Sequence, residues 1–316
     1  MTLREPPKTA SPANLIGRML GLIVMLGLFA VVVWAAATNQ QIAAIERSDP
    51  VVHAPGDYVT AEGIAIHYRD SGGSGPVAVL VHDDSVAGGL TLGDVAADLA
   101  DQGRRVVTPD LFGFGFSARP AEPGARLATN GQADTLATVI EELELGAVEL
   151  VGFGWGGEVA AEVAFARPDL VARLVLVDTP DIPVPPADGR QLEGMPFGLG
   201  VAVAYNREGA AAPAEERFVA GCPAWADCSD PQLLEQFRRA VSVPGTARSI
   251  WARRASDTAA VAAGRLGEIS VPVAVVAVSL TPSQADALAS RFERAEGMVT
   301  TPGRLATAIA GGSGDD

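Results

Sequence analysis

The eight residues from Leu150 to Gly157, LVGFGWGG, constrain the fold of this chain more than any other stretch. An apolar strand runs here into a turn with glycines at alternate positions, Gly152, Gly154 and Gly156, and an alanine-rich helix follows from Glu158. Glycine lets the backbone turn sharply and lets neighbouring segments approach closely. The stretch therefore predicts a tight strand-to-helix turn.

Short apolar strands and amphipathic helices alternate on both sides of this turn. The run PVAVLV at Pro76–Val81 is unbroken and β-branched, as is typical of a strand buried on both faces of a parallel sheet. Further strands are expected at Gly63–Tyr68, Arg105–Thr108, Val148–Val151, Leu174–Asp178 and Val271–Val278, and helices at Leu92–Asp101, Ala133–Leu145, Glu158–Ala166 and Ser283–Ala295. This alternation predicts an α/β fold with a doubly wound, mostly parallel sheet.

The alternation stops between Ile182 and Glu268, where helical stretches such as Pro231–Val241 and Ala247–Ala255 are expected instead. A chain of 316 residues with 48% apolar content can bury one large core together with such an addition.

A second strong feature is the uncharged run MLGLIVMLGLFAVVVWAAA from Met19 to Ala37. At roughly 1.5 Å per residue, such a helix spans close to the ~30 Å hydrocarbon core of a bilayer. The run predicts a transmembrane helix over residues 19–38. The alternative is a cleaved signal peptide ending near Ala35–Ala37, but its apolar region would exceed the roughly 7–15 residues usual for signals, so a retained anchor is favoured.

Charges flanking the run predict its orientation. Arg4, Lys8 and Arg18 precede it, and the segment after it is acidic. The positive-inside rule predicts a single-pass protein with a cytoplasmic N-terminus and an extracytoplasmic domain. The net charge of −15 argues against nucleic acid as a partner.

The two cysteines, Cys222 and Cys228, stand in the sequence GCPAWADC. Their spacing matches no zinc ligand set and no C-x-x-C redox motif. In an exported domain a disulfide is expected, with two free buried thiols as the alternative.

Six segments together resemble the α/β-hydrolase superfamily, in its epoxide-hydrolase and haloperoxidase-like branch. They are Tyr68–Gly72, Val79–His82, Thr108–Ser117, Leu150–Gly157, Arg167–Asp169 and Leu174–Asp178. The resemblance implies a helical cap over an active-site mouth, and hydrolysis of esters, epoxides or carbon–halogen bonds by a nucleophile, an acid and a base. The predicted organisation is a cytoplasmic segment 1–18, a transmembrane helix 19–38, a linker 39–56, core 57–181, helical cap 182–268, core 269–310 and a tail 311–316.

All three catalytic positions implied by the resemblance lack the expected residue. The nucleophile position of the elbow formed by Gly152, Gly154, Trp155 and Gly156 is Gly154, which has no side chain. The acid position, just beyond Val278, holds SLTPS and no carboxylate. The base would follow the last strand, but no histidine follows His82 in the sequence. No catalytic residue is therefore predicted.

The oxyanion-loop position holds His82, Asp83 and Asp84. Asp83 replaces the family's glycine, and carboxylates oppose the stabilisation of developing negative charge. These acids with Glu158 match no metal-ligand motif, so neither a metal nor a cofactor is predicted.

We therefore predict a membrane-anchored pseudohydrolase that binds a partner protein or an apolar small molecule, with a membrane-protein complex as one setting. The alternative is a divergent hydrolase that uses Ser85 or Ser117 as nucleophile and His82 as base.

Overall fold

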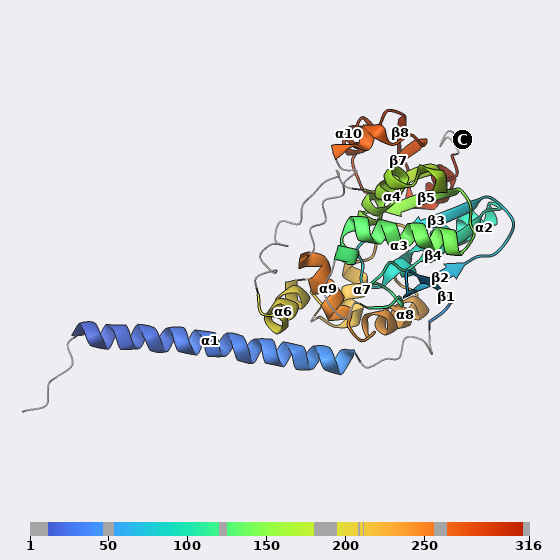
Figure 1. The fold of residues 1–316 in the computed structure, drawn as a ribbon. Helices are drawn as coiled ribbons and strands as arrows, with labels where there is room; N and C mark the ends of the chain where they lie inside the picture. The colour runs from blue at the N-terminus through green and yellow to red at the C-terminus, as the bar shows by residue number, and fades with distance from the viewer. Residues whose placement is uncertain are drawn as a thin grey trace, which may run out of the picture.

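A computed structural model describes residues 12–46, 54–119, 125–179, 195–207, 209–210, 212–255 and 264–311 (Figure 1). The predictions for residues 1–11, for the end of the linker around His53, for the start of the cap at 182–194 and for the last five residues of the tail lie outside the described residues.

The core is an eight-stranded sheet in the order β1-β2-β4-β3-β5-β6-β7-β8. The strands are β1 (Asp57–Ala61), β2 (Ile64–Asp70), β3 (Val77–Val81), β4 (Arg105–Pro109), β5 (Val148–Phe153), β6 (Val171–Val177), β7 (Val273–Ala277) and β8 (Ala295–Val299). β1 and β2 pair antiparallel, β2 pairs antiparallel with β4, and all other pairs are parallel. The predicted doubly wound, mostly parallel sheet is confirmed.

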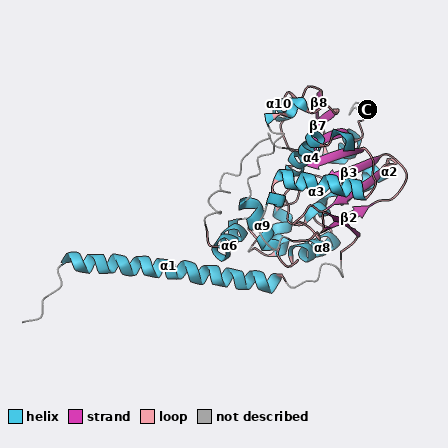
Figure 2. Cartoon of the chain, in the orientation of Figure 1, coloured by secondary structure: helices cyan, strands magenta, loops and turns pink. Residues whose placement is uncertain are grey.

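Helices cover both faces of the sheet (Figure 2). α3 (Thr129–Glu142), α4 (Trp155–Ala166) and α10 (Pro282–Ala289) pack on one face, and α2 (Gly93–Asp101) and α11 (Leu305–Ile309) pack on the other. The central strands are buried because alternate side chains, such as Val79 and Leu80 of β3, enter the two different cores.

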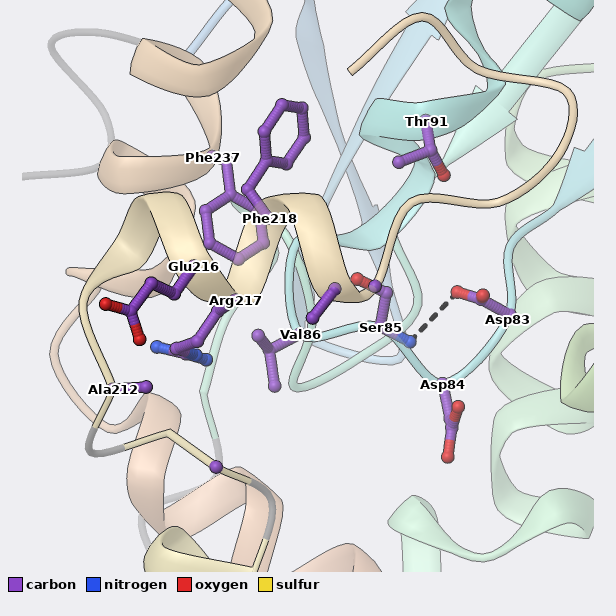
Figure 3. Close-up of a pocket in the computed structure, with 13 residues that line it drawn as sticks. Asp83, Asp84, Ser85, Val86, Thr91, Ala212, Glu216, Arg217, Phe218 and Phe237 are labelled. Atoms are coloured by element: carbon purple, nitrogen blue, oxygen red, sulfur yellow. Dashed lines mark hydrogen bonds between the residues drawn. The ribbon is translucent and has the colours of Figure 1, made fainter. Parts of the chain in front are cut away.

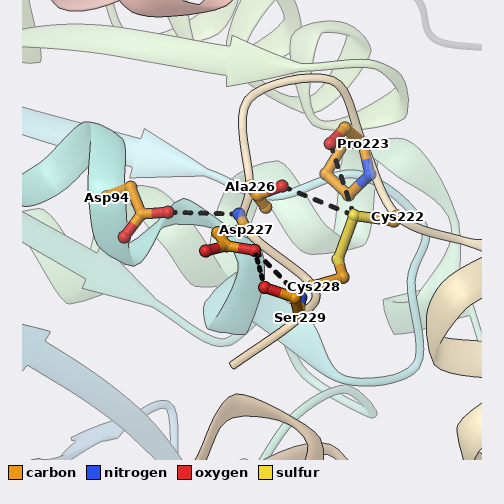
Figure 4. Close-up of a disulfide and its surroundings, with 7 residues drawn as sticks. All are labelled: Asp94, Cys222, Pro223, Ala226, Asp227, Cys228 and Ser229. Atoms are coloured by element: carbon orange, nitrogen blue, oxygen red, sulfur yellow. Dashed lines mark hydrogen bonds between the residues drawn. A yellow bond between two sulfur atoms is a disulfide. The ribbon is translucent and has the colours of Figure 1, made fainter. Parts of the chain in front are cut away.

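Among the described residues, four further helices pack on the loops that follow β3 and β4 and form a cap: α6 (Phe197–Arg207), α7 (Ala214–Ala220), α8 (Pro231–Val241) and α9 (Thr246–Ala255). The loop between α7 and α8 holds the Cys222–Cys228 disulfide, so the predicted pairing is confirmed (Figure 4). In this loop the backbone N–H of Asp227 donates to Asp94 Oδ2 of α2 at 3.3 Å, which joins the cap to the core.

The N-terminal helix α1 (Pro12–Ile45) is much longer than the predicted span 19–38. This helix is both long enough and apolar enough to cross a membrane, and its most apolar part has a mean hydropathy of 2.6. The first part of the predicted linker, Asn39–Ile45, is helical. Gln and Ala favour helix, and Ile42 and Ile45, three residues apart, pack against the cap helices.

Two edge strands also differ from the sequence prediction. β1 and β8 were not predicted as strands, and the helix predicted over Ser283–Ala295 ends at Ala289 as α10. The sequence of β8, AEGMV, has one β-branched residue and a glycine, so it is extended because it pairs with β7 and not because of its own propensity.

Candidate functional site

Gly154 forms the tip of the turn between β5 and α4. Its backbone adopts φ 52° and ψ −122°, a region that side-chain-bearing residues rarely occupy, and its N–H donates to Val177 O at 2.9 Å. β5 is buried along its whole length, and α4 begins at Trp155 immediately after the tip. The strand-to-helix turn predicted at Gly152–Gly156 is therefore present, with Gly154 where a nucleophile would stand.

The turn brings the elbow against the loop that follows β3. A Cβ added to Gly154 would lie 3.2 Å from Asp83 Cβ, and one added to Gly156 would lie 2.2 Å from His82 O. The second distance is impossible for any side chain, so glycine at position 156 is what lets α4 pass the end of β3. The elbow and the His82–Asp84 segment thus lie against each other.

Both ring nitrogens of His82 are engaged with the backbone. Nε2 accepts a hydrogen bond from the N–H of Leu111 at 3.0 Å, which leaves Nδ1–H to donate to Asp83 O. The ring is fully buried, and burial lowers the pKa of the imidazole. His82 is therefore a neutral group that ties two loops together, with no free lone pair to accept a proton.

Ser117 is bound into a separate buried network. Its hydroxyl donates to Asp110 O and accepts from the N–H of His67 at 2.9 Å. The Asp110 carboxylate in turn accepts from His67 Nδ1 at 2.8 Å and from two backbone N–H groups. Burial alone would raise the pKa of Asp110, but the hydrogen bond from His67, the charge of His67 and the nearby Arg69 guanidinium lower it to about 2. Ser117 therefore holds the loop after β4 in place.

Ser85 lies at the edge of a cavity, and its hydroxyl accepts only a long bond, 3.4 Å from the N–H of Ala87. Its own N–H donates to Asp83 Oδ1 at 2.9 Å.

The resemblance implies a catalytic acid in the loop after β7. This loop is hydrogen-bonded to a carboxylate that follows another strand, β6. Asp178, at the end of β6, accepts hydrogen bonds from the N–H groups of Val278, Ser279 and Leu280 at 2.8–3.2 Å. A carboxylate saturated by backbone donors positions a loop. The base position follows β8, where the residues are TTPGR.

A charged group from the cap occupies the space beside Trp155. The guanidinium carbon of Arg253, on α9, lies 4.7 Å from the centroid of the Trp155 ring. Nη2 of Arg253 pairs with Asp84 Oδ2 at 2.6 Å, and only 11% of the arginine side chain is exposed. Sequence reasoning missed Arg253. The one feature of the sequence that pointed to a cation here was Asp84, a carboxylate that an arginine could pair with.

Glu158, one turn into α4, is 6% exposed and interacts electrostatically with both Arg253 and Asp84. Burial raises its pKa to about 7, Asp84 adds to the rise, and Arg253 opposes it. Burial also raises the pKa of Asp83. Within the described part of the chain, no three His, Cys, Asp or Glu side chains are grouped as metal ligands.

A cavity of about 510 Å³ opens between the loop after β3 and the cap. Figure 3 shows Asp83, Asp84 and Ser85 on one side, and Arg217, Phe218 and Phe237 on the other. The volume lies within the roughly 300–1,000 Å³ range of small-molecule sites. Its walls combine aromatic rings with a charged rim.

Curated relatives match part of this chain. A 2-hydroxymuconate semialdehyde hydrolase from Pseudomonas sp. is 33% identical over 136 residues, which are 42% of this chain and 47% of the relative. The lipase LipV of Mycobacterium tuberculosis is 31% identical over 170 residues, which are 54% of this chain and 59% of the relative. The chain thus spans about half the length of the curated relatives it matches.

Solved structures match more of the chain, at lower identity. The epoxide hydrolase CorEH superposes with a TM-score of 0.62 at 21% identity, over 78% of this chain and 90% of that one. This likeness shows a shared fold. The family model for the alpha/beta hydrolase fold matches residues 88–293, well over half of the chain. The chain therefore belongs to the α/β-hydrolase fold family.

Proposed function

We propose that this protein is a membrane-anchored pseudohydrolase, which has lost hydrolytic catalysis and binds an apolar small molecule between the core and the cap. The observation that carries the proposal is Gly154 at the tip of the elbow. The tip has the backbone conformation that presents a nucleophile, but no atom that could attack a substrate.

The neighbouring groups support the loss of catalysis. His82 lies beside the elbow and uses both ring nitrogens on the backbone. Asp84 carries negative charge where donors would stabilise an oxyanion, and Arg253 neutralises it. A hydrolase site that loses its triad loses about 10⁶ in kcat, so residual groups cannot sustain ordinary turnover.

The cavity between the loop after β3 and the cap supports ligand binding. Phe218 and Phe237 are buried beneath it and pack with ring centroids 5.2 Å apart, so the wall is preformed. An apolar ligand with one polar end would contact the rings and reach the charged rim. The apolar helix α1 supports membrane attachment, and the basic residues Arg4, Lys8 and Arg18 favour a cytoplasmic N-terminus.

A hydrolytic activity is the second candidate, because one curated relative is named a hydrolase and another a lipase. It would need Ser85 as nucleophile, since that hydroxyl borders the cavity. Turnover abolished by Ser85→Ala would favour it over the pseudohydrolase.

The binding proposal can be tested by calorimetry on the full chain in detergent, with 4-phenyl-1-butanol as a soluble apolar probe. Ala220 and Val219 are neighbours on α7, but only Ala220 borders the cavity. Ala220→Trp should abolish binding by filling the space, and Val219→Trp should leave it intact. Equal binding by both variants, or no binding by the parent chain, would contradict the proposal.

A further inference from the structure

The C-terminal end of α1 is fixed to the cap, so the helix does not lead into a free linker. Thr38 and Ile42 are only 6% and 7% exposed, and Ile42 packs in a cluster with Val201 of α6 and Trp251 of α9. By contrast, the most apolar part of α1 is not buried at all. The exposed apolar part of α1 therefore continues, within a few residues of the same helix, into a part that is packed against the cap.

Polar contacts strengthen this attachment. The Glu46 carboxylate accepts hydrogen bonds from the N–H groups of Gly245 and Ala247 at 2.8 and 2.6 Å. These groups are at the beginning of α9, where N–H groups lack helical partners and a negative charge is stabilising. Glu46, which directly follows α1, thus provides an N-terminal cap for α9.

The position of α6 relative to the apolar run follows from one hydrogen bond. Asn39 Nδ2 donates to Gly198 O at 3.0 Å. Asn39 is two residues beyond Ala37, where the apolar run ends, and two residues advance a helix by about 3 Å. Each headgroup layer of a bilayer is roughly 5–7 Å deep. If the run Met19–Ala37 crosses the hydrocarbon, Gly198 lies within the headgroup layer.

The chain around Gly198 suits such a position. The segment Met195–Leu199, MPFGL, carries no charged residue, and Pro196 and Gly198 are exposed. Figure 1 shows α6 beside the C-terminal part of α1, with α10 and β8 at the opposite end of the domain.

We propose that Met195–Leu199, at the start of α6, is a second membrane-contacting segment that lies in the headgroup layer beside α1 and holds the cap against the bilayer. The occupant of this surface is the lipid itself, because the segment carries no charged residue and is hydrogen-bonded to α1 through Asn39, two residues beyond the apolar run. The inference rests on the proposed membrane attachment of α1. It adds that the start of α6 is the part of the cap that faces the membrane.

Site-directed fluorescence on the full chain in phosphatidylcholine vesicles tests this inference. Single cysteines at Val32, Pro196 and Val299 are labelled with the NBD fluorophore under non-reducing conditions, so that Cys222–Cys228 stays paired. All three positions are exposed: Val32 in the apolar run, Pro196 before α6 and Val299 on β8. Nitroxide lipids spin-labelled near the headgroup should quench the first two labels and leave the Val299 label bright.

The labels separate the two claims. Quenching at Val32 without quenching at Pro196 would overturn the second contact and leave the anchor intact. An unquenched Val32 label would overturn the anchor, and the second contact with it.

A pair of substitutions tests the docking of α1. Ile42→Glu places a charge among buried apolar residues and should remove the quenching at Pro196, whereas Ala44→Glu, at an exposed position on the same helix, should leave it unchanged. Equal quenching in both variants would show that the cap reaches the membrane without α1, and would overturn the coupling.

Discussion

The guanidinium of Arg253 lies over the ring of Trp155, 4.7 Å from its centroid, while the same side chain pairs with Asp84 at 2.6 Å. Trp155 follows Gly154 at the elbow, Asp84 belongs to the loop after β3, and Arg253 comes from α9 of the cap. One side chain therefore joins the three parts that meet at the candidate site.

We expect Arg253→Ala to destabilise the full chain by about 1–3 kcal/mol, because it removes a largely buried cation–π contact together with an ion pair and their packing. Arg253→Lys should retain part of this stability, since an ammonium keeps the charge but not the planar stacking. The change is measured as the free energy of unfolding in denaturant. Arg239→Ala, which breaks an exposed pair with Glu235, is the matched control and should have little effect. An Arg253→Ala variant as stable as the parent would exclude a joining role.

Glu158 should make the stability of the domain depend on pH near neutrality. Its folded-state pKa is about 7, raised by burial above the ordinary 4.5, so the folded chain holds this proton more tightly than the unfolded chain. Ionisation of Glu158 therefore costs stability above pH 7, and the cost is relieved as the pH falls from about 7 to about 4.5.

We expect Glu158→Gln to raise the free energy of unfolding by about 1–3 kcal/mol at pH 8 and to change it little near pH 4.5. Unfolding curves at both values measure the difference. Glu142→Gln, at the exposed end of α3, should show no such pH dependence. A stabilisation by Glu158→Gln that is the same at both pH values would contradict the raised pKa.

The Cys222–Cys228 bridge closes a short loop, and by the chain-entropy relation its removal should cost about 2 kcal/mol. The Cys222→Ser, Cys228→Ser double variant should therefore fold with a lower unfolding midpoint. Reduction of the parent chain should lower the midpoint equally, and should not change the double variant. A double variant that fails to fold would contradict this prediction, because it would show that the disulfide stabilises more of the domain than the loop that it closes.

Much of the fold could be predicted from the sequence, because β3, β6 and β7 are short segments rich in valine and the glycines of the Gly152–Gly156 turn favour a tight strand-to-helix turn. β8 could not, since its extended backbone comes from pairing with β7. The helical continuation Asn39–Ile45 was also missed. Its polar residues resemble a linker, and only the packing of Ile42 against the cap makes it part of the domain.

The parts of the candidate site that belong to the core sheet and its loops could be predicted from the sequence. The closeness of His82–Asp84 to the elbow followed from the family resemblance, as did the places where a nucleophile, acid and base would stand. Arg253 was not predictable, because it reaches Trp155 from a cap helix whose packing leaves no periodic signal. The 510 Å³ cavity depends in the same way on how α7 and α8 lie over the core.

Restoring a hydroxyl at the elbow should not restore hydrolysis. Gly154→Ser must adopt a backbone conformation that costs of order 1–3 kcal/mol, and its Cβ would press on Asp83 at 3.2 Å. Without a free base the serine stays a weak nucleophile. Gly154→Ala carries the same strain without the hydroxyl, so the two variants should show equal stability and equal background rates in an ester assay. Ester hydrolysis by the serine variant alone would reveal a base that the contacts of His82 do not allow.

The loss of the nucleophile is tested most directly by covalent labelling of the unmodified full chain. Purified protein in detergent is incubated with a fluorophosphonate probe, which reacts with activated serines, and its intact mass is measured beside that of an active serine esterase treated in the same way. We expect the esterase to gain one adduct and this protein to keep its mass, because Gly154 has no side chain and the hydroxyl of Ser117 is hydrogen-bonded in the core. A stoichiometric adduct on any serine of this chain would contradict the pseudohydrolase assignment.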